Sequence, residues 1–457
     1  MSEVVESLWC RRGWLQVGSL GAFGLGLSSL LSSENRPIAG KPSTKRSCIL
    51  FLLHGGPSQL DTWDMKPHAP DNIRGIFRPI QTRVPGIHIS ECMPRLAQRS
   101  HLFRIVRSMT HSAINHNTAT YTVTTGHSPI RDLIAFTPSE NDFPHLGAQV
   151  SMAAPVRRTV PTAVSLPDSV SDGPYTTPGQ NGGFLGAAHA PFHVLGDPSD
   201  PNFHVEGLSR GSSGLRDREN LRKQLANNKS HTDRSLQSKG FEQYRERAMD
   251  ILASDETRFA FRLDREPLRI RETYGLHKYG QSLLLARRLV EAGVRLVTVY
   301  WGGKVNNPNP YWDTHFNNNR RLKDELLPPF DECFSAFLDD LQIRGMLETT
   351  LILAMGEFGR TPRFGQFTGN GVNETGRDHW SACYSLLLAG GPAGGGKILG
   401  KSDRFAAFPS DEPFTPGDLQ ATVLDALGIS PQTKVRDGFG RMTPLSEGRI
   451  CSEFFGT

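Results

Sequence analysis

The stretch "LILAMGEFGRTPRF", residues 351–364, begins as an apolar run and ends with a carboxylate and a guanidinium. The run from Leu351 to Met355 is typical of a parallel strand that is buried on both faces. In open parallel sheets, ligands bind outside the carboxyl ends of the strands. We therefore expect Glu357 and Arg360, which follow the run directly, to lie at a ligand site.

Similar short apolar runs recur along the chain, at residues 48–53, 102–106, 162–166, 294–301, 350–355 and 384–390. Segments with helical periodicity separate several of them, at residues 282–293, 327–345 and 415–429. Strands that alternate with helices indicate an α/β fold built on a doubly wound, mostly parallel sheet.

The composition excludes several classes of protein. The chain has 457 residues, of which 37% are hydrophobic and 21% charged, as in a soluble globular protein. Its formal net charge of +5 is spread along the chain, and no basic run is dense enough to predict nucleic-acid binding. The six cysteines show no CxxC spacing and no disulfide framework, so we interpret them as small buried hydrophobic residues.

The N-terminal segment resembles a twin-arginine export signal. Arg11 and Arg12 are followed by Trp14, Leu15 and a weak, Gly-rich apolar run that is too short to span a membrane comfortably. We interpret residues 1–46 as signal and linker, and expect a periplasmic or secreted protein with no membrane span in the mature chain. An ordinary amphipathic N-terminus is the alternative. An uncleaved anchor also stays open, since no clear A-x-A cleavage site follows.

Residues 206–277 differ from the rest of the chain. They are rich in Arg, Lys, Asp and Gln and poor in strand-forming residues. The spacing of Leu, Phe and Met favours a polar helical insertion over one edge of the core, with a disordered linker as the alternative.

Histidines and carboxylates gather next to five of the predicted strands. They are His54, Asp61 and Asp64; His111, His116, Asn117 and Thr118; Asp313 and His315; Glu357 and Arg360; and Asp378 and His379. Carboxylates and imidazoles that converge in one cleft need a balancing cation or ligand. Mixed Asp, Glu and His ligands suit zinc, manganese or iron better than calcium.

The local spacing refines this set. Asp313 and His315 are two residues apart, so both side chains of an extended segment point the same way. Asp378 and His379 are adjacent and point to opposite faces, so one of them is expected to bind the metal and the other to orient a ligand. Each residue taken alone also has an ordinary structural use in a turn, a helix cap or an ion pair.

Six motifs in order resemble the domain-of-unknown-function 1501 family of secreted bacterial proteins. They are "FLLHGGPSQLDTWDMKPHAP", "NHNTATYTVTTG", "GQSLLLARRLVEAGVRLVTV", "WDTH", "GEFGRTPR" and "GRDHW". That family is grouped with the alkaline phosphatase and sulfatase superfamily. The resemblance implies that residues 47–450 form a three-layer α/β/α sandwich. It also implies hydrolysis or transfer of phosphate or sulfate esters with one or two divalent metals.

The resemblance also assigns roles to individual residues. Glu357 takes the position of a metal-binding Asp, and Phe358 stands where that superfamily has a His. His379 matches the last His ligand of the superfamily, and Asp313 and His315 resemble another Asp and His pair. The first strand ends in His54 rather than Asp, and "HNT" at residues 116–118 fills the nucleophile position without Cys or Ser.

The sequence therefore predicts an exported metal-dependent hydrolase of phosphoric or sulfuric esters. The predicted metal ligands are His54, Asp61, Asp313, His315, Glu357, Asp378 and His379, and the predicted catalytic residues are His116, Asn117, Thr118 and Arg360. The metal is zinc or manganese, and the partner is a small anionic ester or a sulfated or phosphorylated polymer. A secreted binding or assembly protein on a catalytically altered scaffold is the alternative.

One geometric prediction tests the site directly. Glu357 is expected within metal-ligand reach of a point shared with His315 and His379. Arg360 is expected beside the cleft, positioned for an anionic ligand. Gly356 and Gly359 would let the backbone turn sharply there without a Cβ clash.

Overall fold

The computed structural model describes residues 46–156, 159–205, 208, 248–302 and 311–455. The predicted export signal lies outside these residues, apart from Arg46 at its end. Most of the predicted insertion also lies outside them. Both assignments stay predictions.

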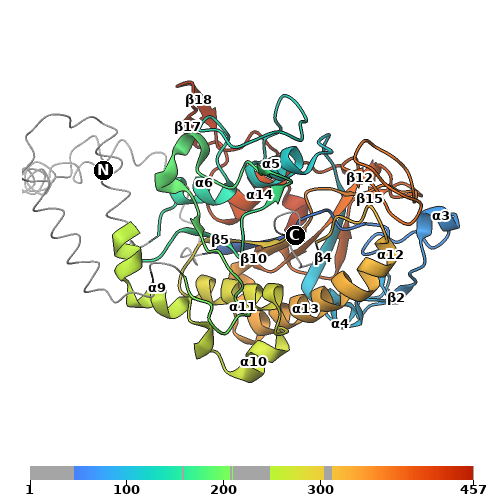
Figure 1. Ribbon diagram of the computed structural model, residues 1–457, viewed down its shortest axis with the longest axis horizontal. Coiled ribbons are helices and arrows are strands. Elements are labelled where there is room, and N and C mark those ends of the chain that lie inside the picture. The colour runs from blue at the N-terminus through green and yellow to red at the C-terminus, as the bar shows by residue number, and fades with distance from the viewer. Residues whose placement is uncertain (1–45, 157–158, 206–207, 209–247, 303–310, 456–457) are drawn as a thin grey trace, which may run out of the picture. The chain divides into compact units, whose positions relative to one another are not determined.

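An eight-stranded sheet forms the centre of the described chain, with strand order β14-β4-β13-β10-β1-β9-β5-β8 (Figure 1). The strands are β1 (Ser47–Leu53), β4 (Phe103–Met109), β5 (Ala163–Leu166), β8 (Phe192–His193), β9 (Leu296–Trp301), β10 (Thr350–Met355), β13 (Tyr384–Ala389) and β14 (Lys397–Leu399). Every strand in the sheet runs parallel to its neighbours except β13, which is antiparallel to both β10 and β4. The expected mostly parallel sheet is confirmed.

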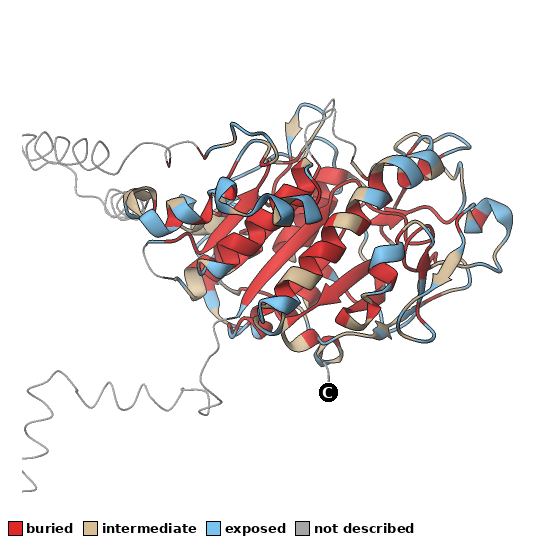
Figure 2. Ribbon diagram, turned by 90° about the horizontal axis from the view of Figure 1, so that it is seen from below, coloured by how far each residue is buried: buried red, intermediate tan, exposed pale blue. Residues whose placement is uncertain are grey.

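Helices cover both faces of the sheet (Figures 1 and 2). One face packs against α11 (Lys278–Glu291), α13 (Leu327–Ile343) and α4 (Pro94–Ala97), and the other against α5 (His116–Thr125), α6 (Leu146–Ala153) and α14 (Pro416–Ala426). In β1, Ile49 and Phe51 face the first layer, and Leu50 and Leu52 face the second. The architecture is thus the expected three-layer α/β/α sandwich, and the burial of both faces explains the continuous apolar run of β1.

The local sequence explains where the main helices begin and end. α14 starts with a capping box between Thr415 and Asp418, with Pro416 as its first residue. α5 ends at Gly126, whose left-handed conformation (φ 73°) lets its N–H bond the Thr122 carbonyl. These signals fix the ends of the two helices that pack together on one face of the sheet.

All six apolar runs of the sequence form strands of this sheet, and the three periodic segments form α11, α13 and α14. The edge strands β8 and β14 were not predicted, because two or three residues are too few to show a periodicity. The direction of β13 was also not predicted. Because β13 is antiparallel, the residues before it lie at the same edge of the sheet as the residues after β1, β9 and β10.

The described part of the insertion is helical, with α9 (Asp255–Ala260), the 3₁₀ turn Leu263–Arg265 and α10 (Leu268–Thr273). Phe261 and Leu263 are buried in the same core as α11 and α13. This part therefore packs against a helical layer through apolar side chains and is less polar than expected.

Short elements complete the described chain. The helical ones include α3 (Asp71–Arg74), α12 (Asn318–Arg321) and the π-helical turn Leu322–Leu326. The two-stranded pairs are β2 (Pro79–Gln81) with β3 (His88–Ser90), β6 (Ser171–Asp172) with β7 (Tyr175–Thr176), β11 (Gly359–Arg360) with β12 (His379–Trp380), β15 (Lys401–Ser402) with β16 (Pro409–Asp411), and β17 (Lys434–Arg436) with β18 (Met442–Pro444). Within the described residues, no helix has the length and hydrophobicity needed to cross a bilayer. The described cysteines are free thiols, and all but Cys92 are buried.

Candidate metal centre

The ends of the central strands bring five segments of the chain together. His54 follows β1, Glu357 follows β10 by one residue, and Asp313 lies after β9. His116 is the first residue of α5, after β4, and His379 lies on β12, which precedes the antiparallel strand β13. These side chains meet because the carboxyl ends of β1, β4, β9 and β10 and the start of β13 share one edge of the sheet.

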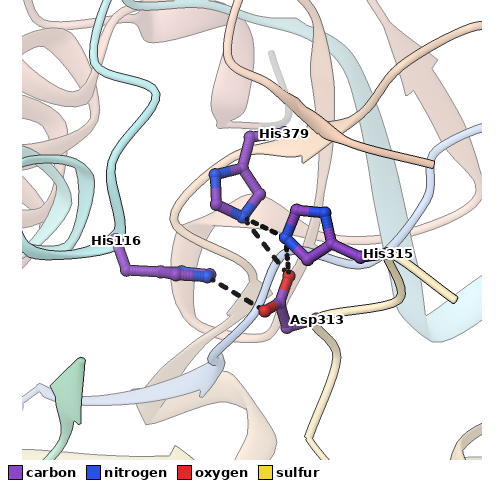
Figure 3. Close-up of side chains that lie close together, drawn as sticks. All are labelled: His116, Asp313, His315 and His379. Carbon is purple, nitrogen blue, oxygen red and sulfur yellow. Dashed lines mark hydrogen bonds and ion pairs between the residues drawn. The ribbon is translucent and has the colours of Figure 1, made fainter. Parts of the chain in front are cut away.

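His116, Asp313, His315 and His379 form a compact cluster, called here the metal cluster (Figure 3). The Asp313 Oδ1 atom lies 2.9 Å from His315 Nε2 and 3.3 Å from His379 Nε2. The two Nε2 atoms of His315 and His379 are 3.0 Å apart, and His116 Nε2 lies 3.4 Å from Asp313 Oδ2. Three imidazole nitrogens and one carboxylate therefore converge on a single point.

Outer hydrogen bonds set the tautomer of the histidines. His379 Nδ1 lies 2.6 Å from the Ile114 carbonyl, which can only accept, so Nδ1 carries the proton and Nε2 presents a lone pair to the cluster. His315 Nδ1 lies 3.5 Å from the Asp378 carboxylate. Asp378 thus lies behind His315 rather than in the cluster, which is the orienting role that the sequence left open for one residue of the Asp378–His379 pair.

A second group of donors shares His116 with the metal cluster. His116 Nδ1 lies 2.6 Å from Glu357 Oε1, and His54 Nε2 lies 3.7 Å from the same oxygen. The Gly55 N–H donates to both Glu357 oxygens, at 2.9 and 3.1 Å. Neither ring nitrogen of His54 has a hydrogen-bond partner in the described chain, although the residue is buried. His116 is therefore the link between the metal cluster and Glu357.

The predicted position of Glu357 is right only in part. It contacts His116 and His54, but its carboxylate belongs to this second group rather than to the point shared by His315 and His379.

The two carboxylates are held in the charged form. Burial would raise the pKa of Asp313, but Arg360 and His116 hold it well below its usual range. Burial acts in the same way on Glu357, and His54 and His116 lower its pKa to about 2. Both side chains therefore bring negative charge into the interior, which Arg360 and the His116 cation balance in the metal-free protein.

The imidazoles differ from one another. Burial would lower the pKa of His116, but Asp313 and Glu357 raise it to about 10. Burial and the neighbouring His116 lower the pKa of His379 to about 3, and burial lowers that of His54. In the absence of metal, His116 alone among these three is favoured as a cation.

The metal cluster fits a divalent transition metal. Zinc–nitrogen bonds of about 2.0–2.1 Å place tetrahedral ligand atoms about 3.3–3.4 Å apart. The measured separations of 2.9, 3.0, 3.3 and 3.4 Å are close to this range. The Nε2 atom of His116 is also buried without a hydrogen-bond partner in the described chain, as expected for an atom that binds an ion.

A family model described as "Protein of unknown function (DUF1501)" matches residues 45–455. The chain belongs to this family. The family predicted from the sequence is thus confirmed. No curated protein matches the chain.

Solved structures with a similar fold include members of the expected superfamily. One is a protein in the alkaline phosphatase superfamily from Vibrio parahaemolyticus, with 11% identity, 86% of this chain and 68% of that chain covered, and a TM-score of 0.39. Another is PsFucS1 sulfatase from Pseudoalteromonas sp., with 12% identity, 94% and 78% covered, and a TM-score of 0.38. A third is the phosphonate monoester hydrolase SpPMH from Silicibacter pomeroyi, with 12% identity, 90% and 76% covered, and a TM-score of 0.37.

In this DUF1501 chain, Arg360 is not placed as predicted. Its guanidinium is fully buried and donates to the carbonyls of Gly55, Gly56 and Arg377 and to the carboxylate of Asp313. These contacts use the donors that were expected to bind an ester. Arg360 instead orients Asp313 and fixes the turn after β1.

Asp61 is not brought to the metal cluster. Its carboxylate accepts from Arg377 Nε at 2.8 Å, from Ser58 Oγ at 2.6 Å and from Asn318 Nδ2 at 3.0 Å. Both Asp61 and Arg377 are fully buried. The loop residue that looked like a metal ligand is therefore half of a satisfied internal ion pair.

Asn117 and Thr118 also have other partners. Thr118 Oγ1 donates to the Asp132 carboxylate and lies 3.0 Å from the Asn115 carbonyl. The Asn117 amide donates to the Ile134 carbonyl at 2.6 Å. Both residues thus hold the segment after α5 against the start of that helix, and neither contacts the metal cluster. The predicted nucleophile is engaged in a structural hydrogen bond.

Phe358, where the sequence resemblance implied a missing histidine, packs against two imidazoles of the metal cluster. Its ring centre lies 4.4 Å from that of His379 and 5.1 Å from that of His116. The ring is completely buried. It therefore forms an apolar wall that restricts the rotation of two imidazoles.

His111 supports the site but was not assigned a role from the sequence. Its Nδ1 accepts from the Ala113 N–H, so its Nε2 carries the proton and donates to the Glu357 carbonyl at 2.6 Å. Gln59 acts in a similar way on Arg360, since its amide bonds both the N–H and the carbonyl of that residue. The sequence placed His111 near a strand end, but nothing in the sequence predicts the backbone groups that His111 and Gln59 bind.

The glycines on either side of Glu357 and Phe358 avoid Cβ clashes, as predicted. Gly356 does not adopt a positive φ, but a Cβ there would lie 2.4 Å from Pro57 Cδ. Gly55 has φ 111°, and a Cβ there would lie 2.2 Å from the Asp313 nitrogen. Close backbone approach, with left-handed geometry at Gly55, is what requires glycine at this site.

Proposed function

We propose that this chain is an exported, metal-dependent hydrolase of phosphoric or sulfuric esters. The observation that carries the proposal is the convergence of three imidazole nitrogens and one carboxylate at the ligand-binding edge of a mostly parallel sheet. Such a donor set suits zinc, manganese or iron. The substrate is a small anionic ester or a sulfated or phosphorylated polymer.

The residues of the metal cluster and their neighbours have separate roles in this proposal. Asp313, His315, His379 and His116 would hold the ion, which supplies Lewis-acid polarisation of the ester when bound. Glu357 keeps the proton of His116 on Nδ1, and the Ile114 carbonyl does the same for His379. His379 therefore presents its Nε2 lone pair directly, whereas His116, a cation in the metal-free protein, would have to release its Nε2 proton to hold the ion.

Because Thr118 is bound to Asp132, water is the nucleophile in this proposal. Phe358 and the buried walls of the cluster limit access, and the most exposed side chains are Asp313 at 13% and His315 at 11%, so in this proposal the ester approaches from their side. This makes the reaction a direct hydrolysis without a covalent enzyme intermediate.

Metal analysis and an ester panel test the proposal together. The full-length protein is purified after export, its metal content is measured by mass spectrometry, and hydrolysis of 4-nitrophenyl phosphate and 4-nitrophenyl sulfate is followed. Asp313→Asn should lower bound metal and hydrolysis by about tenfold or more, because it removes the charged ligand. His88→Ala, an exposed histidine on β3, should change neither. Hydrolysis by the protein stripped of metal would overturn the proposal.

Export by the folded-cargo route rests on the Arg11–Arg12 motif. Changing both residues to Lys is expected to hold the protein in the cytoplasm, as seen by cell fractionation. Unchanged export of that variant would contradict this part of the proposal.

A specific observation favours the second candidate, a secreted binding or assembly protein with a structural metal. Four protein donors already complete a tetrahedral ion, and structural zinc sites are closed in this way. The hydrogen bonds that already occupy the side chains of Thr118, Asn117 and Arg360 also favour this candidate. One bound metal per chain with no hydrolysis of any ester would select this candidate.

A further inference from the structure

A groove lies beside the β11–β12 ribbon, on residues that neither the metal cluster nor the proposed reaction uses. It encloses about 540 Å³. We call it the aromatic groove and define it by Trp380, Phe405, Phe408, Arg363, Asn72 and Gln366, which line it.

The aromatic groove lies close to the metal cluster, on the opposite face of the β11–β12 ribbon. Arg360 pairs with His379 across the ribbon, and Gly359 pairs with Trp380. Because neighbouring residues of a strand point to opposite faces, His379 faces the cluster while Trp380 faces the groove. One pair of short strands thus contributes to both places.

The walls of the groove are aromatic and open to solvent. Trp380 is half-buried, and its ring centre lies 5.6 Å from that of Phe408, nearly perpendicular to it. The Phe408 ring is 54% exposed although it is large and apolar. Exposed apolar surface with a polar rim is typical of a binding site. Flat aromatic faces match the C–H faces of sugar rings, and they lose little conformational entropy on binding.

The loop that carries two of these rings is held rigidly. Asp403 Oδ1 accepts from the Phe405 and Ala407 N–H groups at 2.9 Å, and the Asp403 N–H donates to the Phe408 carbonyl at 2.9 Å. Trp380 Nε1 donates to the Ala407 carbonyl at 2.6 Å. A groove that is already ordered pays less entropy when a ligand binds.

Two arginines beside the groove lack acidic partners. Among the described residues, neither Arg363 nor Arg404 takes part in an ion pair, and both are exposed. The guanidinium of Arg404 lies 4.5 Å from the centre of the Phe405 ring. By contrast, Arg74 in the same neighbourhood is bound to Asp71 at 2.6 Å. The free guanidinium groups give the groove the donors that recognise sulfate or phosphate oxygens.

We propose that the aromatic groove binds a sugar unit that carries a sulfate or phosphate ester group. Trp380 and Phe408 cover the ring, Asn72 and Gln366 reach its hydroxyl groups, and Arg363 and Arg404 bind the anionic group. The proposal deepens the substrate class of the proposed function, on which the choice of ester rests. The binding itself does not depend on the metal.

The test measures binding of dextran sulfate and of uncharged dextran by affinity gel electrophoresis of the full-length protein. Dextran sulfate should retard the protein, and dextran should do so about tenfold more weakly, because the guanidinium contacts are lost. Arg363→Ala and Phe408→Ala should each lower the affinity for dextran sulfate about tenfold. Treatment of the protein with EDTA should leave this binding unchanged.

Matched controls come from residues that do not line the aromatic groove. Arg265 is an exposed arginine on a 3₁₀ turn, with no ion pair in the described chain, and Phe439 is 72% exposed with Arg441 over its ring. Arg265→Ala and Phe439→Ala should leave dextran sulfate binding unchanged.

Absent binding, or equal losses in the controls, would overturn the proposal. Equally strong binding of polyglutamate would overturn the saccharide assignment. Loss of ester hydrolysis with retained binding would count only against the proposed function.

Discussion

Two buried charge clusters lie a short distance apart along the same loops, and they differ in one respect. Asp61 and Arg377 are fully buried, and hydrogen bonds to Ser58, Asn318 and backbone carbonyls satisfy both side chains. In the metal cluster, His116 Nε2 is buried and has no hydrogen-bond partner in the described chain. The first cluster is complete without a ligand, and the second is not.

The comparison shows that a buried carboxylate alone does not indicate a metal site. Asp61 and Asp313 both follow strands and both contact a buried arginine. Only Asp313 also faces several imidazole nitrogens. The imidazole nitrogens around Asp313, and not the negative charge of the carboxylate, distinguish the candidate metal centre.

The largest expected effect on stability comes from breaking the Asp61–Arg377 ion pair. Arg377→Met leaves Asp61 buried without its partner and should lower the free energy of unfolding by about 3–5 kcal/mol. Bound metal per folded chain should stay the same. Urea unfolding followed by circular dichroism, with metal analysis of the folded fraction, measures both. Arg265→Met, an exposed position, is the control and should change stability by less than about 0.5 kcal/mol. Metal loss in folded Arg377→Met would mean that the two clusters are one.

A smaller but more local effect is expected from Gly55→Ala. A Cβ there would lie 2.2 Å from the Asp313 nitrogen, on a backbone with φ 111°. Strain and overpacking together should cost about 3 kcal/mol and lower the metal content. Gly86→Ala separates the two causes, because Gly86 also has positive φ (84°) but no atom within 4 Å of a Cβ. That control should cost about 1 kcal/mol and leave the metal unchanged. Equal effects of the two variants would contradict a close approach at the site.

The pH dependence of stability should also separate the clusters. Asp313 and Glu357 raise the pKa of His116 from 6.5 to about 10 in the metal-free protein. The folded state then binds more protons than the unfolded state, so this stabilisation is present below pH 6.5 and is lost as pH rises towards 10. The slope should approach about 1.4 kcal/mol per pH unit. Unfolding in chelator between pH 6.5 and 10 measures it, and His116→Gln should remove it. The same slope in His116→Gln would assign it to another group.

The sequence was sufficient for the sheet because its central strands are buried on both faces. Runs such as residues 48–53 are continuous and apolar for that reason, and each run becomes a strand. The short edge strand β8 and the ribbon β11–β12 have two residues per strand, which leaves no pattern to detect. The direction of β13 depends on the path of the whole chain and has no local signal.

The site was predictable only at the level of strand ends. All four residues of the metal cluster were among the predicted site residues, since each lies close to a strand end at one edge of the sheet. The partners of Asp61 and Arg360 were not predictable, because Arg377 is 316 residues from Asp61 and Asp313 is 47 residues from Arg360. Which arginine neutralises which carboxylate is decided by tertiary packing.

The smallest expected effect concerns Thr118, where sequence and structure disagree most. Its hydroxyl donates to Asp132 across the start of α5, so Thr118→Ala should lower the free energy of unfolding by about 1 kcal/mol. Metal content and ester hydrolysis should not change, because the hydroxyl does not contact the metal cluster. Thr122→Ala is a control on the same helix, since the Thr122 hydroxyl bonds only the Thr118 carbonyl among its described partners.

The two readouts of Thr118→Ala separate a structural role from a catalytic one. A structural hydrogen bond lost from the helix start lowers stability and leaves turnover intact, and Thr118→Ser restores the bond. A nucleophile lost from the site does the reverse: stability stays within a few tenths of a kcal/mol of Thr122→Ala, while turnover falls by several orders of magnitude with metal still bound. That second outcome would require Thr118 to leave Asp132 when substrate binds. It would also add Thr118 to the reacting residues beside His116 at the start of α5.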